Sequence, residues 1–391
     1  MIQIHLKPGK DQSLLRFHPW VFSGAIKKMD GKPTEGELVE VISNEGNFLG
    51  IGHFQVGSIT VRIVSFTKEN IDYPFWKNKL YLAYQLRKTL NLAENPQNNV
   101  YRLIHGEGDG LPGLIIDIYN DTAVMQTHSV GMYLTREHFA KALQDIYGER
   151  LVAVYDKSEG TIPFKANTGA KNGYIWGNSQ PGTVLEYGNK FQIDWVEGQK
   201  TGFFIDQREN RRMVEHYSKD RTVLNVFGYT GGFSVYALRG GAKLVHSVDS
   251  SEKAIDLTNQ NVASNFPSAN HEAFAVDAFE YLNGMDDQYD LIILDPPAFA
   301  KHQDALRNAL QAYKRINTRA FSKIKPGGIL FTFSCSQVVT KDQFRQAVFS
   351  AAAIAKRNVR ILHQLTQPAD HPVNIYHPEG EYLKGLVLYV E

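Results

Sequence analysis

The residue with the most distinctive chemistry in this chain of 391 residues is its single cysteine, Cys335. It follows the apolar run 329–333 and lies between two serines. A lone cysteine after a strand is ordinarily a small buried hydrophobe, but a thiolate at the end of a strand is also a strong nucleophile. The position of Cys335 predicts a catalytic thiol if other functional side chains gather at the same edge of a sheet.

Three carboxylates also follow segments that are expected to form buried strands. Asp249 comes after residues 244–248, Asp277 closes the run that begins at Phe274, and Asp295 comes after residues 291–294. Each of them alone would more often be a helix N-cap than a ligand contact. The carboxyl ends of parallel strands meet at one edge of a sheet, so the three carboxylates are expected there together.

A glycine turn follows the first strand of this set, with the sequence Phe227-Gly228-Tyr229-Thr230-Gly231-Gly232-Phe233. Its order is G-x-x-G-G, not G-x-G-x-x-G, and no Lys-Ser/Thr pair follows, so the dinucleotide and nucleoside-triphosphate fingerprints are absent. A purely structural turn is the alternative. Together with a carboxylate for the ribose hydroxyls and another for an adenine amine, the turn predicts a site for S-adenosylmethionine (SAM).

The elements that must position these residues divide the chain into three predicted domains. Residues 1–66 hold short alternating runs at 37–42, 48–51 and 59–64, separated by Gly/Asn/Ser turns, which predicts a small β-barrel or sandwich. Residues 67–187 combine helical stretches near 76–92 and 135–147 with strands at 114–118, 122–127 and 151–155, which predicts an α+β middle domain.

Residues 188–391 alternate buried-type strands with helices. The strands are expected at 222–227, 244–248, 291–294 and 329–333, and the helices near 232–239, 251–265 and 304–324. Alternation of this kind predicts an α/β domain with a doubly wound parallel sheet, which binds ligands at the carboxyl ends of its strands.

Composition sets limits on the class of protein. The chain is 43% hydrophobic and 21% charged, which is typical of a globular protein, and one cysteine excludes an intramolecular disulfide. No run approaches the 18 or more apolar residues of a membrane helix, so a soluble, cytoplasmic protein with no membrane partner is expected. The thirteen histidines show no H-E-x-x-H or similar spacing, and no metal is expected. With a net charge of +1, a nucleic-acid partner would need a local basic patch.

Two further motifs accompany the glycine turn: D-P-P-A-F at 295–299 and S-C-S at 334–336. Together the three resemble the glycine loop, the D-P-P-x-F motif and the S-C-S motif of the RlmI-type 23S ribosomal RNA cytosine-C5 methyltransferases, which are class I SAM-dependent enzymes. The resemblance extends over essentially the whole chain. H-P-W-V-F-S-G at 18–24 matches an N-terminal PUA domain, G-D-G-L-P-G at 108–113 a middle domain, and K-T-G-F-F-I-D-Q-R at 200–208 the start of a catalytic domain. D-H-P-V at 370–373 and P-E-G-E-Y-L-K-G at 378–385 match near the C-terminus.

This resemblance implies that Cys335 attacks C6 of a cytosine in large-subunit ribosomal RNA, which makes C5 nucleophilic enough to be methylated. Asp295 would bind the N3 and N4 edge of the base. The base that removes the C5 proton stays open between Asp295, a water molecule and the neighbourhood of Asp206 and His371. Many RNA cytosine-C5 methyltransferases carry a second cysteine beside the D-P-P motif, whereas Ala298 and Phe299 stand there in this chain.

The expected site residues follow from these inferences. We expect the cofactor to be bound by Asn225, Phe227, Gly228, Thr230, Gly231, Asp249, Asp277, Asp295 and Gln207. The expected substrate contacts are Phe299, Lys301, Arg208, Trp20 and Lys27. Phe299 could equally be a core aromatic residue and Lys301 a solvated lysine. Arg208, Arg211 and Arg212 could form an RNA-facing strip or a plain solvated helix face.

Two rival functions remain open from the sequence. The first is a methyltransferase that acts on a purine nitrogen of RNA, and such an enzyme would need no thiol at position 335. The second is an RNA-binding protein without catalysis, which would have no affinity for SAM. The oligomeric state is equally open, with a homodimer as one expectation.

Overall fold

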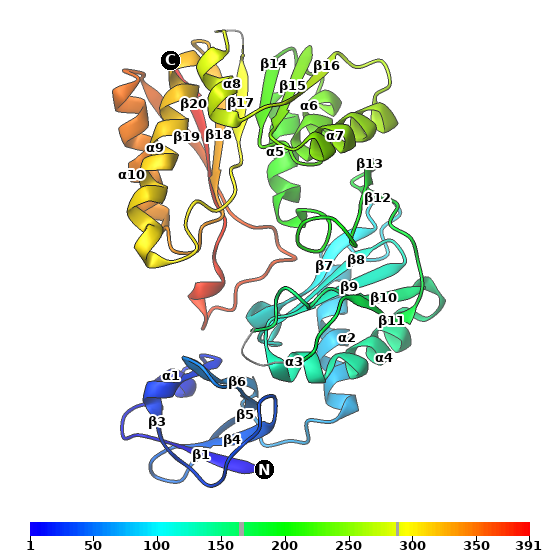
Figure 1. Cartoon of the computed structure of the whole chain (residues 1–391), viewed down its shortest axis with the longest axis vertical. Helices are drawn as coiled ribbons and strands as arrows, with labels where there is room; N and C mark the ends of the chain where they lie inside the picture. The colour runs from blue at the N-terminus through cyan, green and yellow to red at the C-terminus, as the bar shows by residue number, and fades with distance from the viewer. Residues whose placement is uncertain (164–167, 287–288) are drawn as a thin grey trace. The chain divides into compact units, whose positions relative to one another are not determined.

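The computed structural model describes residues 1–163, 168–286 and 289–391 (Figure 1). The chain forms two compact units. Unit one holds residues 1–184, 193–205 and 369–380, and unit two holds residues 185–192, 206–368 and 381–391. The three-domain division expected at residues 66 and 187 remains a prediction. Within the described ranges, no helix has the length and hydrophobicity needed to cross a membrane.

Unit one begins with a six-stranded sheet in the order β2-β6-β5-β4-β1-β3. Its strands are β1 (Ile2–Leu6), β2 (Trp20–Phe22), β3 (Ile26–Met29), β4 (Leu38–Ile42), β5 (Phe48–Phe54) and β6 (Ile59–Ser65), and the short helix α1 is Gln12–Leu15. Only β1 and β4 pair in parallel. Alternate residues such as Ile4, Val39 and Val41 are buried on one face, because side chains of a strand alternate between two faces. The expected β-domain is confirmed as a half-barrel.

The rest of unit one is built on a five-stranded sheet in the order β11-β10-β9-β8-β7. Its strands are β7 (Val100–His105), β8 (Leu114–Tyr119), β9 (Thr122–Thr127), β10 (Ala153–Asp156) and β11 (Gly173–Gly177). Helices α2 (Tyr73–Thr89), α3 (Val130–Leu134) and α4 (Arg136–Tyr147) accompany them, and α2 and α4 supply buried residues to the same core. The mixture confirms the α+β character expected for this region.

The segment 369–380 is anchored in unit one by a buried ion network. Arg87, with 0% of its side chain exposed, donates to both carboxylate oxygens of Asp109 and to the main-chain oxygen of Asp370 at 2.8 Å. The Asp370 carboxylate accepts from the Arg102 amide at 3.0 Å. Buried charges are tolerated when they are paired in this way, so these bonds hold the D-H-P-V motif against the middle region.

Unit two contains a seven-stranded sheet in the order β16-β15-β14-β17-β18-β20-β19. The strands are β14 (Thr222–Val226), β15 (Leu244–Asp249), β16 (His271–Ala275), β17 (Leu291–Leu294), β18 (Gly328–Ser334), β19 (Val359–Leu365) and β20 (Lys384–Val390). The first five run in parallel, as expected. The expectation of a wholly parallel sheet needs one correction, because β20 runs antiparallel to both β18 and β19. A hairpin of β12 (Thr183–Glu186) and β13 (Asn189–Gln192) precedes this sheet.

Helices cover both faces of the seven-stranded sheet (Figure 1). Helices α5 (Arg208–Tyr217), α6 (Gly232–Arg239) and α7 (Glu252–Asn265) lie on one side, and α8 (Ala278–Gly284), α9 (Leu306–Lys323) and α10 (Lys341–Ile354) on the other. Alternate residues of β14 face the two layers: Val223 packs with α5 and α6, and Leu224 packs with α8 and α9. Such a strand is buried on both sides, which explains why the sequence of β14 is mainly hydrophobic.

The strand order reverses at β14, which lies between β15 and β17. Crossovers leave in opposite directions on either side of this point, so a crevice opens at the carboxyl ends of β14 and its neighbours. The topology therefore places Gly228, Asp249, Asp295 and Cys335, which lie at or just after the ends of β14, β15, β17 and β18, at a single edge.

Candidate active site

The turn after β14 contains three residues with positive φ values, which make a tight loop. Phe227 and Tyr229 have φ values of 63° and 45°, and Gly231 has a φ of 74°. A Cβ atom on Gly231 would lie 2.7 Å from Cγ2 of Thr258, so position 231 requires glycine. The Tyr229 and Thr230 carbonyls accept from Thr258 Oγ1 and Asn261 Nδ2 of α7 at 2.9 and 2.8 Å. The loop is therefore held rigidly, with backbone available for a ligand.

One buried polar atom lies directly under this loop. Asn225, on β14, is fully buried and donates from Nδ2 to Ser234 at 2.9 Å. Its Oδ1 has no hydrogen-bond partner among the described residues. A buried acceptor left in this state costs free energy, so it marks a position where a ligand or water would supply the donor. Together with the glycine loop, Asn225 fits the site expected for SAM.

The two expected adenosine carboxylates differ in what they already bind. Asp249, the last residue of β15, accepts from the amides of Tyr229 and Ser251, each at 3.0 Å. It thus ties the second strand end to the glycine loop. Asp277 is the N-cap of α8, where Oδ1 accepts from the amides of Phe279 and Glu280. A helix cap was the alternative to adenine binding for Asp277, and Oδ1 has that role here. Oδ2, the other carboxylate oxygen, accepts neither of those two hydrogen bonds.

Asp295 lies directly after β17 beside a second carboxylate. Burial, followed by the charge of Asp206, raises the pKa of Asp295 to about 7, against a hydrogen bond from Gln207. Asp206 accepts from the hydroxyl of Tyr382 at 2.7 Å through Oδ2, and its Oδ1 has no partner within the described residues. An acidic side chain in this setting can hold a proton at neutral pH and donate it to a ligand.

Cys335 follows β18, the strand next to β17, and its Sγ is 3.9 Å from the main-chain oxygen of Pro296. Burial is the largest cause of a thiol pKa raised to about 12, and the carboxylates of Asp295 and Asp206 add to it. Cys335 is therefore a thiol at neutral pH, so its proton must be removed before or during attack on an electrophile. Two neighbouring strand ends thus place a thiol and a carboxyl group around one loop.

Lys384 is a component of the site that sequence reasoning missed. It is buried at the start of β20, opposite Ser334 in the β18 ladder, and donates to the main-chain oxygens of Ser336 and Val339 at 2.6 and 2.9 Å. Burial lowers its pKa to about 8, and it opposes the rise in the pKa of Cys335. Lys384 belongs to the sequence motif E-Y-L-K-G, but the sequence does not show that it lies beside the Cys335 loop. The antiparallel pairing of β20 with β18 brings the two together.

The expected substrate residues of unit two have different surroundings. Phe299 is half-buried and its ring lies 4.8 Å from that of Tyr313, so it packs against the core. Lys301 is exposed. The expected strip of exposed arginines on α5 is not formed: Arg208 and Arg211 are buried beside the carboxylate of Glu186, and only Arg212 is exposed. The negative charge of the buried carboxylate stabilises the two buried guanidinium groups.

Glu186 is the anion that holds α5 against the hairpin. It is 0% exposed and accepts two bonds from Arg211, at 2.8 and 2.7 Å, with the Tyr236 hydroxyl at 3.0 Å. Glu186→Gln is expected to lower the free energy of unfolding by about 3–5 kcal/mol, because it leaves buried cations without their anion. Chemical denaturation measures this change. Glu209→Gln, in the exposed pair with Arg212, should cost less than about 1 kcal/mol, and equal losses for the two variants would contradict the assignment.

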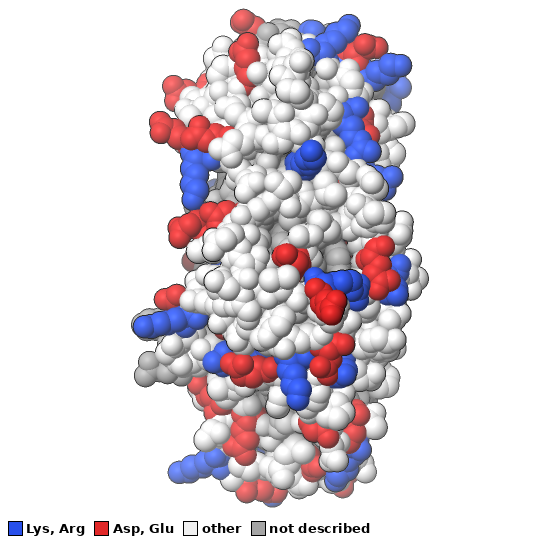
Figure 2. All heavy atoms as spheres, turned by 90° about the vertical axis from the view of Figure 1, so that its right-hand side faces the viewer, with Lys and Arg blue, Asp and Glu red and all other residues white. Residues whose placement is uncertain are grey.

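The expected contacts in unit one lie on the N-terminal half-barrel. Trp20 is half-buried and donates from Nε1 to Glu107 at 2.8 Å, and Lys27 is exposed and donates to Asn44 at 2.9 Å. His371, one of the open choices for the base, is also in unit one, buried beside Asp370 and His105. On the face drawn in Figure 2, basic and acidic side chains are interspersed.

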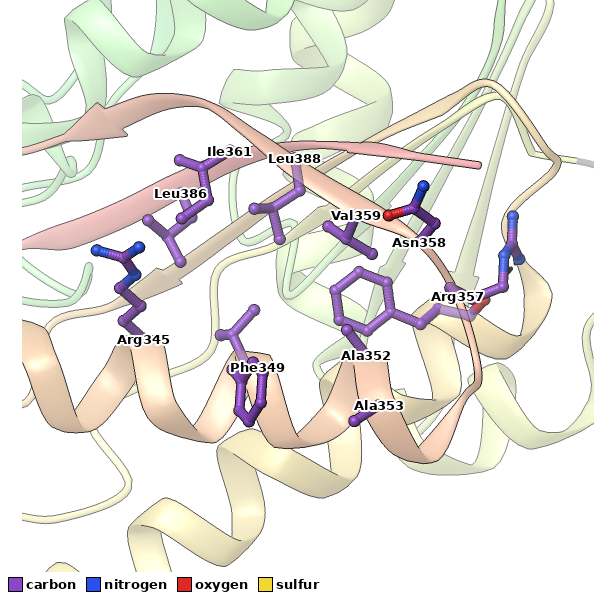
Figure 3. Close-up of a pocket in the computed structure, with 12 residues that line it drawn as sticks. Arg345, Phe349, Ala352, Ala353, Arg357, Asn358, Val359, Ile361, Leu386 and Leu388 are labelled. Carbon is purple, nitrogen blue, oxygen red and sulfur yellow. Dashed lines mark hydrogen bonds between the residues drawn. The ribbon is translucent and has the colours of Figure 1, made fainter.

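A separate groove of about 370 Å³ lies between α10 and strands β19 and β20. Figure 3 shows Val359, Ile361, Leu386 and Leu388 of the strands facing α10, with Arg345 and Arg357 at opposite ends. None of the expected cofactor residues lines it. This apolar groove is distinct from the strand-end site.

Two family comparisons agree with this architecture. Residues 174–375 match the S-adenosylmethionine-dependent methyltransferase family, and residues 4–66 match the PUA-like domain. The match covers just over half of the chain, including the glycine loop and all the strand-end residues of unit two. The chain is therefore a SAM-dependent methyltransferase, as the strand-end carboxylates and the glycine loop predicted.

Relatives define the family more closely. The chain is 40% identical to ribosomal RNA large subunit methyltransferase I of Enterobacter sp. strain 638 over 397 residues, covering 100% of this chain and 99% of the relative. It is 41% identical to the protein of the same name from Tolumonas auensis and 39% identical to one from Escherichia coli, over 98% and 100% of this chain and 98% and 99% of those relatives. The chain belongs to the ribosomal RNA large subunit methyltransferase I family.

Solved structures share the fold over the full length. A candidate SAM-dependent methyltransferase from Streptococcus mutans covers 100% of both chains with a TM-score of 0.84 and 23% identity. A candidate methyltransferase in complex with SAH also covers 100% of both chains, with a TM-score of 0.85 and 24% identity. The half-barrel, middle region and methyltransferase sheet therefore occur together in other proteins.

Proposed function

We propose that this enzyme forms 5-methylcytidine in large-subunit ribosomal RNA through a covalent bond between Cys335 and C6 of the target cytosine. The supporting observation is the position of Cys335 and Asp295 at the ends of adjacent strands, with the Cys335 Sγ 3.9 Å from the loop that follows Asp295. The names of the relatives supply the ribosomal substrate. A purine nitrogen is already nucleophilic and would need no thiol at this place.

The thiol is needed because C5 of cytosine is a poor nucleophile. Cys335 loses its proton and its sulfur bonds to C6, which pushes electrons through the ring and leaves C5 with enamine character. C5 then takes up the methyl group, a base removes the proton from C5, and the electrons of that C–H bond restore the double bond as the thiolate leaves. The second cysteine found beside the D-P-P motif in many RNA cytosine-C5 methyltransferases is absent here, so Cys335 leaves without help from another thiol.

Asp295 stabilises the adduct in this proposal. Attack at C6 builds negative charge on N3 of the cytosine, and a protonated carboxyl group can donate a hydrogen bond to that atom. A pKa of about 7 keeps a large fraction of Asp295 protonated at neutral pH. Gln207, which hydrogen-bonds Asp295, orients the carboxyl group.

SAM, when bound, supplies an electrophilic methyl group. We infer that Asn225, Phe227, Gly228, Thr230 and Gly231 line its binding loop, with Asp249 at the ribose and Asp277 at the adenine. Two observations support this placement: the buried Oδ1 of Asn225 has no hydrogen-bond partner in the described part of the chain, and position 231 has no room for a Cβ atom.

The proposal is tested with ribosomal RNA that lacks the modification. Methyl transfer from labelled SAM, followed by digestion and mass spectrometry of the nucleosides, should yield 5-methylcytidine. RNA containing 5-fluorocytidine at the target should become covalently attached to the protein, because fluorine cannot leave C5 as a proton does. A methylated purine as the product would overturn the proposal and favour a nitrogen methyltransferase.

Asp249→Asn is expected to weaken SAM binding by about 10- to 100-fold, because an anionic acceptor for the ribose hydroxyls is replaced by a neutral amide. Equilibrium dialysis with labelled SAM measures the dissociation constant. Asp256→Asn, on the exposed face of α7, is the matched control and should bind SAM as the unaltered enzyme does. Equal affinities for all three proteins would remove Asp249 from the cofactor site.

A further inference from the structure

A cluster of potential metal-ligating side chains lies outside the proposed active site. It combines a residue near the start of unit one with two residues of the last segment of this unit. His18 lies just before β2, and His377 and Glu379 lie in the segment 369–380. One ligand atom from each residue lies within 4.8 Å of the other two. We propose that these three side chains bind a divalent transition-metal ion of the zinc type.

The spacing of the ligand atoms fits such an ion. His18 Nε2 is 3.5 Å from one Glu379 oxygen, and His377 Nε2 is 3.8 Å from the other. Two ligands bound tetrahedrally at about 2.0–2.1 Å from zinc lie roughly 3.3 Å from each other. These two separations are too long for good hydrogen bonds and slightly longer than this value. All three ligand atoms lie within 4.8 Å of one another, so an inward movement would complete the ligand set.

The second observation is the state of His377. It is 3% exposed, and neither of its ring nitrogens has a hydrogen-bond partner among the residues that the structure describes. Its ring packs 4.3 Å from that of Trp20 and 5.4 Å from that of His18. Its Nε2 lies 3.8 Å from a Glu379 oxygen, so this nitrogen faces the cluster. A buried imidazole without a partner is unfavourable, and a bound ion would remove this deficit.

The ligand types suit a zinc-type ion. Two imidazoles and one carboxylate form a three-ligand zinc set with a fourth position for water. The exposed Glu379 leaves a path for the ion.

Binding at His18 Nε2 has one structural consequence. The Trp20 amide donates to His18 Nδ1 at 3.3 Å, and coordination through Nε2 would move the imidazole proton to Nδ1. This long hydrogen bond would therefore open when the ion binds. The ion would in return tie the start of β2 to the segment 369–380, which the Arg87 network also anchors.

Zinc binding to the full-length chain tests the inference directly. The protein, without a histidine tag and stripped with a chelator, is dialysed against Zn²⁺ and the bound metal is measured by mass spectrometry, with Co²⁺ absorption reporting tetrahedral geometry. We expect one ion per chain. His377→Gln and Glu379→Gln should each weaken binding by at least about 10-fold, because each removes one of three protein ligands.

A histidine–carboxylate pair on the same half-barrel provides the control. His5 lies 2.7 Å from Asp30, and His5→Gln should leave zinc binding unchanged. Circular dichroism of each variant checks that it is folded, and Glu379→Gln alters an exposed side chain that is least able to disturb folding. Equal zinc binding by the unaltered chain and both ligand variants, or no binding above the background, would overturn the proposed site.

Discussion

Replacing Cys335 by alanine is expected to lower the rate of methyl transfer by at least about 10³-fold while SAM affinity changes by no more than about twofold. The loss follows from the chemistry: without a sulfur atom to add to C6, C5 of cytosine stays unreactive. The cofactor loop, in contrast, is held by contacts from β15 and α7 that do not involve Cys335. Single-turnover methylation and equilibrium dialysis of the same protein measure the two quantities.

Cys335→Ser is the companion variant, because it preserves size and polarity but supplies a much weaker nucleophile. It should be nearly as inactive as Cys335→Ala and should form no covalent complex with RNA containing 5-fluorocytidine. Full activity of either variant would exclude the covalent mechanism. Loss of SAM binding in both would instead indicate a structural role for Cys335, which packs partly against the core beneath α5 and α6.

Asp295→Asn is expected to reduce kcat by about 10²–10⁴-fold and to change the shape of its pH profile. The thiolate fraction of Cys335 rises tenfold per pH unit below its pKa of about 12. The protonated fraction of Asp295 is nearly constant below its pKa of about 7 and falls tenfold per unit above it. The rate for the unaltered enzyme should therefore rise up to about pH 7 and then level off.

In Asp295→Asn the second titration is absent, so the remaining rate should go on rising above pH 7. Removing the carboxylate also lowers the pKa of the thiol, because Asp295 is one of the charges that raise it. Asp290→Asn is the matched control: Asp290 precedes the opposite end of β17, is paired with Lys325, and should leave the plateau intact. A plateau that persists in Asp295→Asn would assign the pKa of about 7 to another group.

Much of the candidate site could be predicted from the sequence because parallel strands bring their carboxyl ends to one edge. Asp249, Asp295 and Cys335 each lie at or just after the end of a mainly apolar segment, and such segments form buried central strands whose ends coincide in space. Local patterns also predicted α6 and β9 at the bounds that the structure has, since each is delimited by turn residues. These features depend on periodicity and local breaks, which a single sequence displays.

Other features depend on contacts between distant segments and could not be predicted. Basic residues such as Arg208 and Arg211 show the same sequence pattern whether they face water or a buried carboxylate. In the folded chain both are buried, because Glu186 in the preceding hairpin supplies a buried carboxylate beside them. The partner of Lys384 followed from the insertion of β20 between β18 and β19, against the direction of its neighbours.

The histidine–glutamate cluster shows the same limit most clearly. His18 and His377 lie near opposite ends of the chain, and no local spacing relates them. The sequence alone predicted the strand-end residues of the candidate site, because these residues follow each strand directly along the chain. The tertiary structure decided which charged side chains are buried and which histidines lie next to each other. Burial and charge pairing depend on contacts between distant segments, and a local sequence pattern does not contain those contacts.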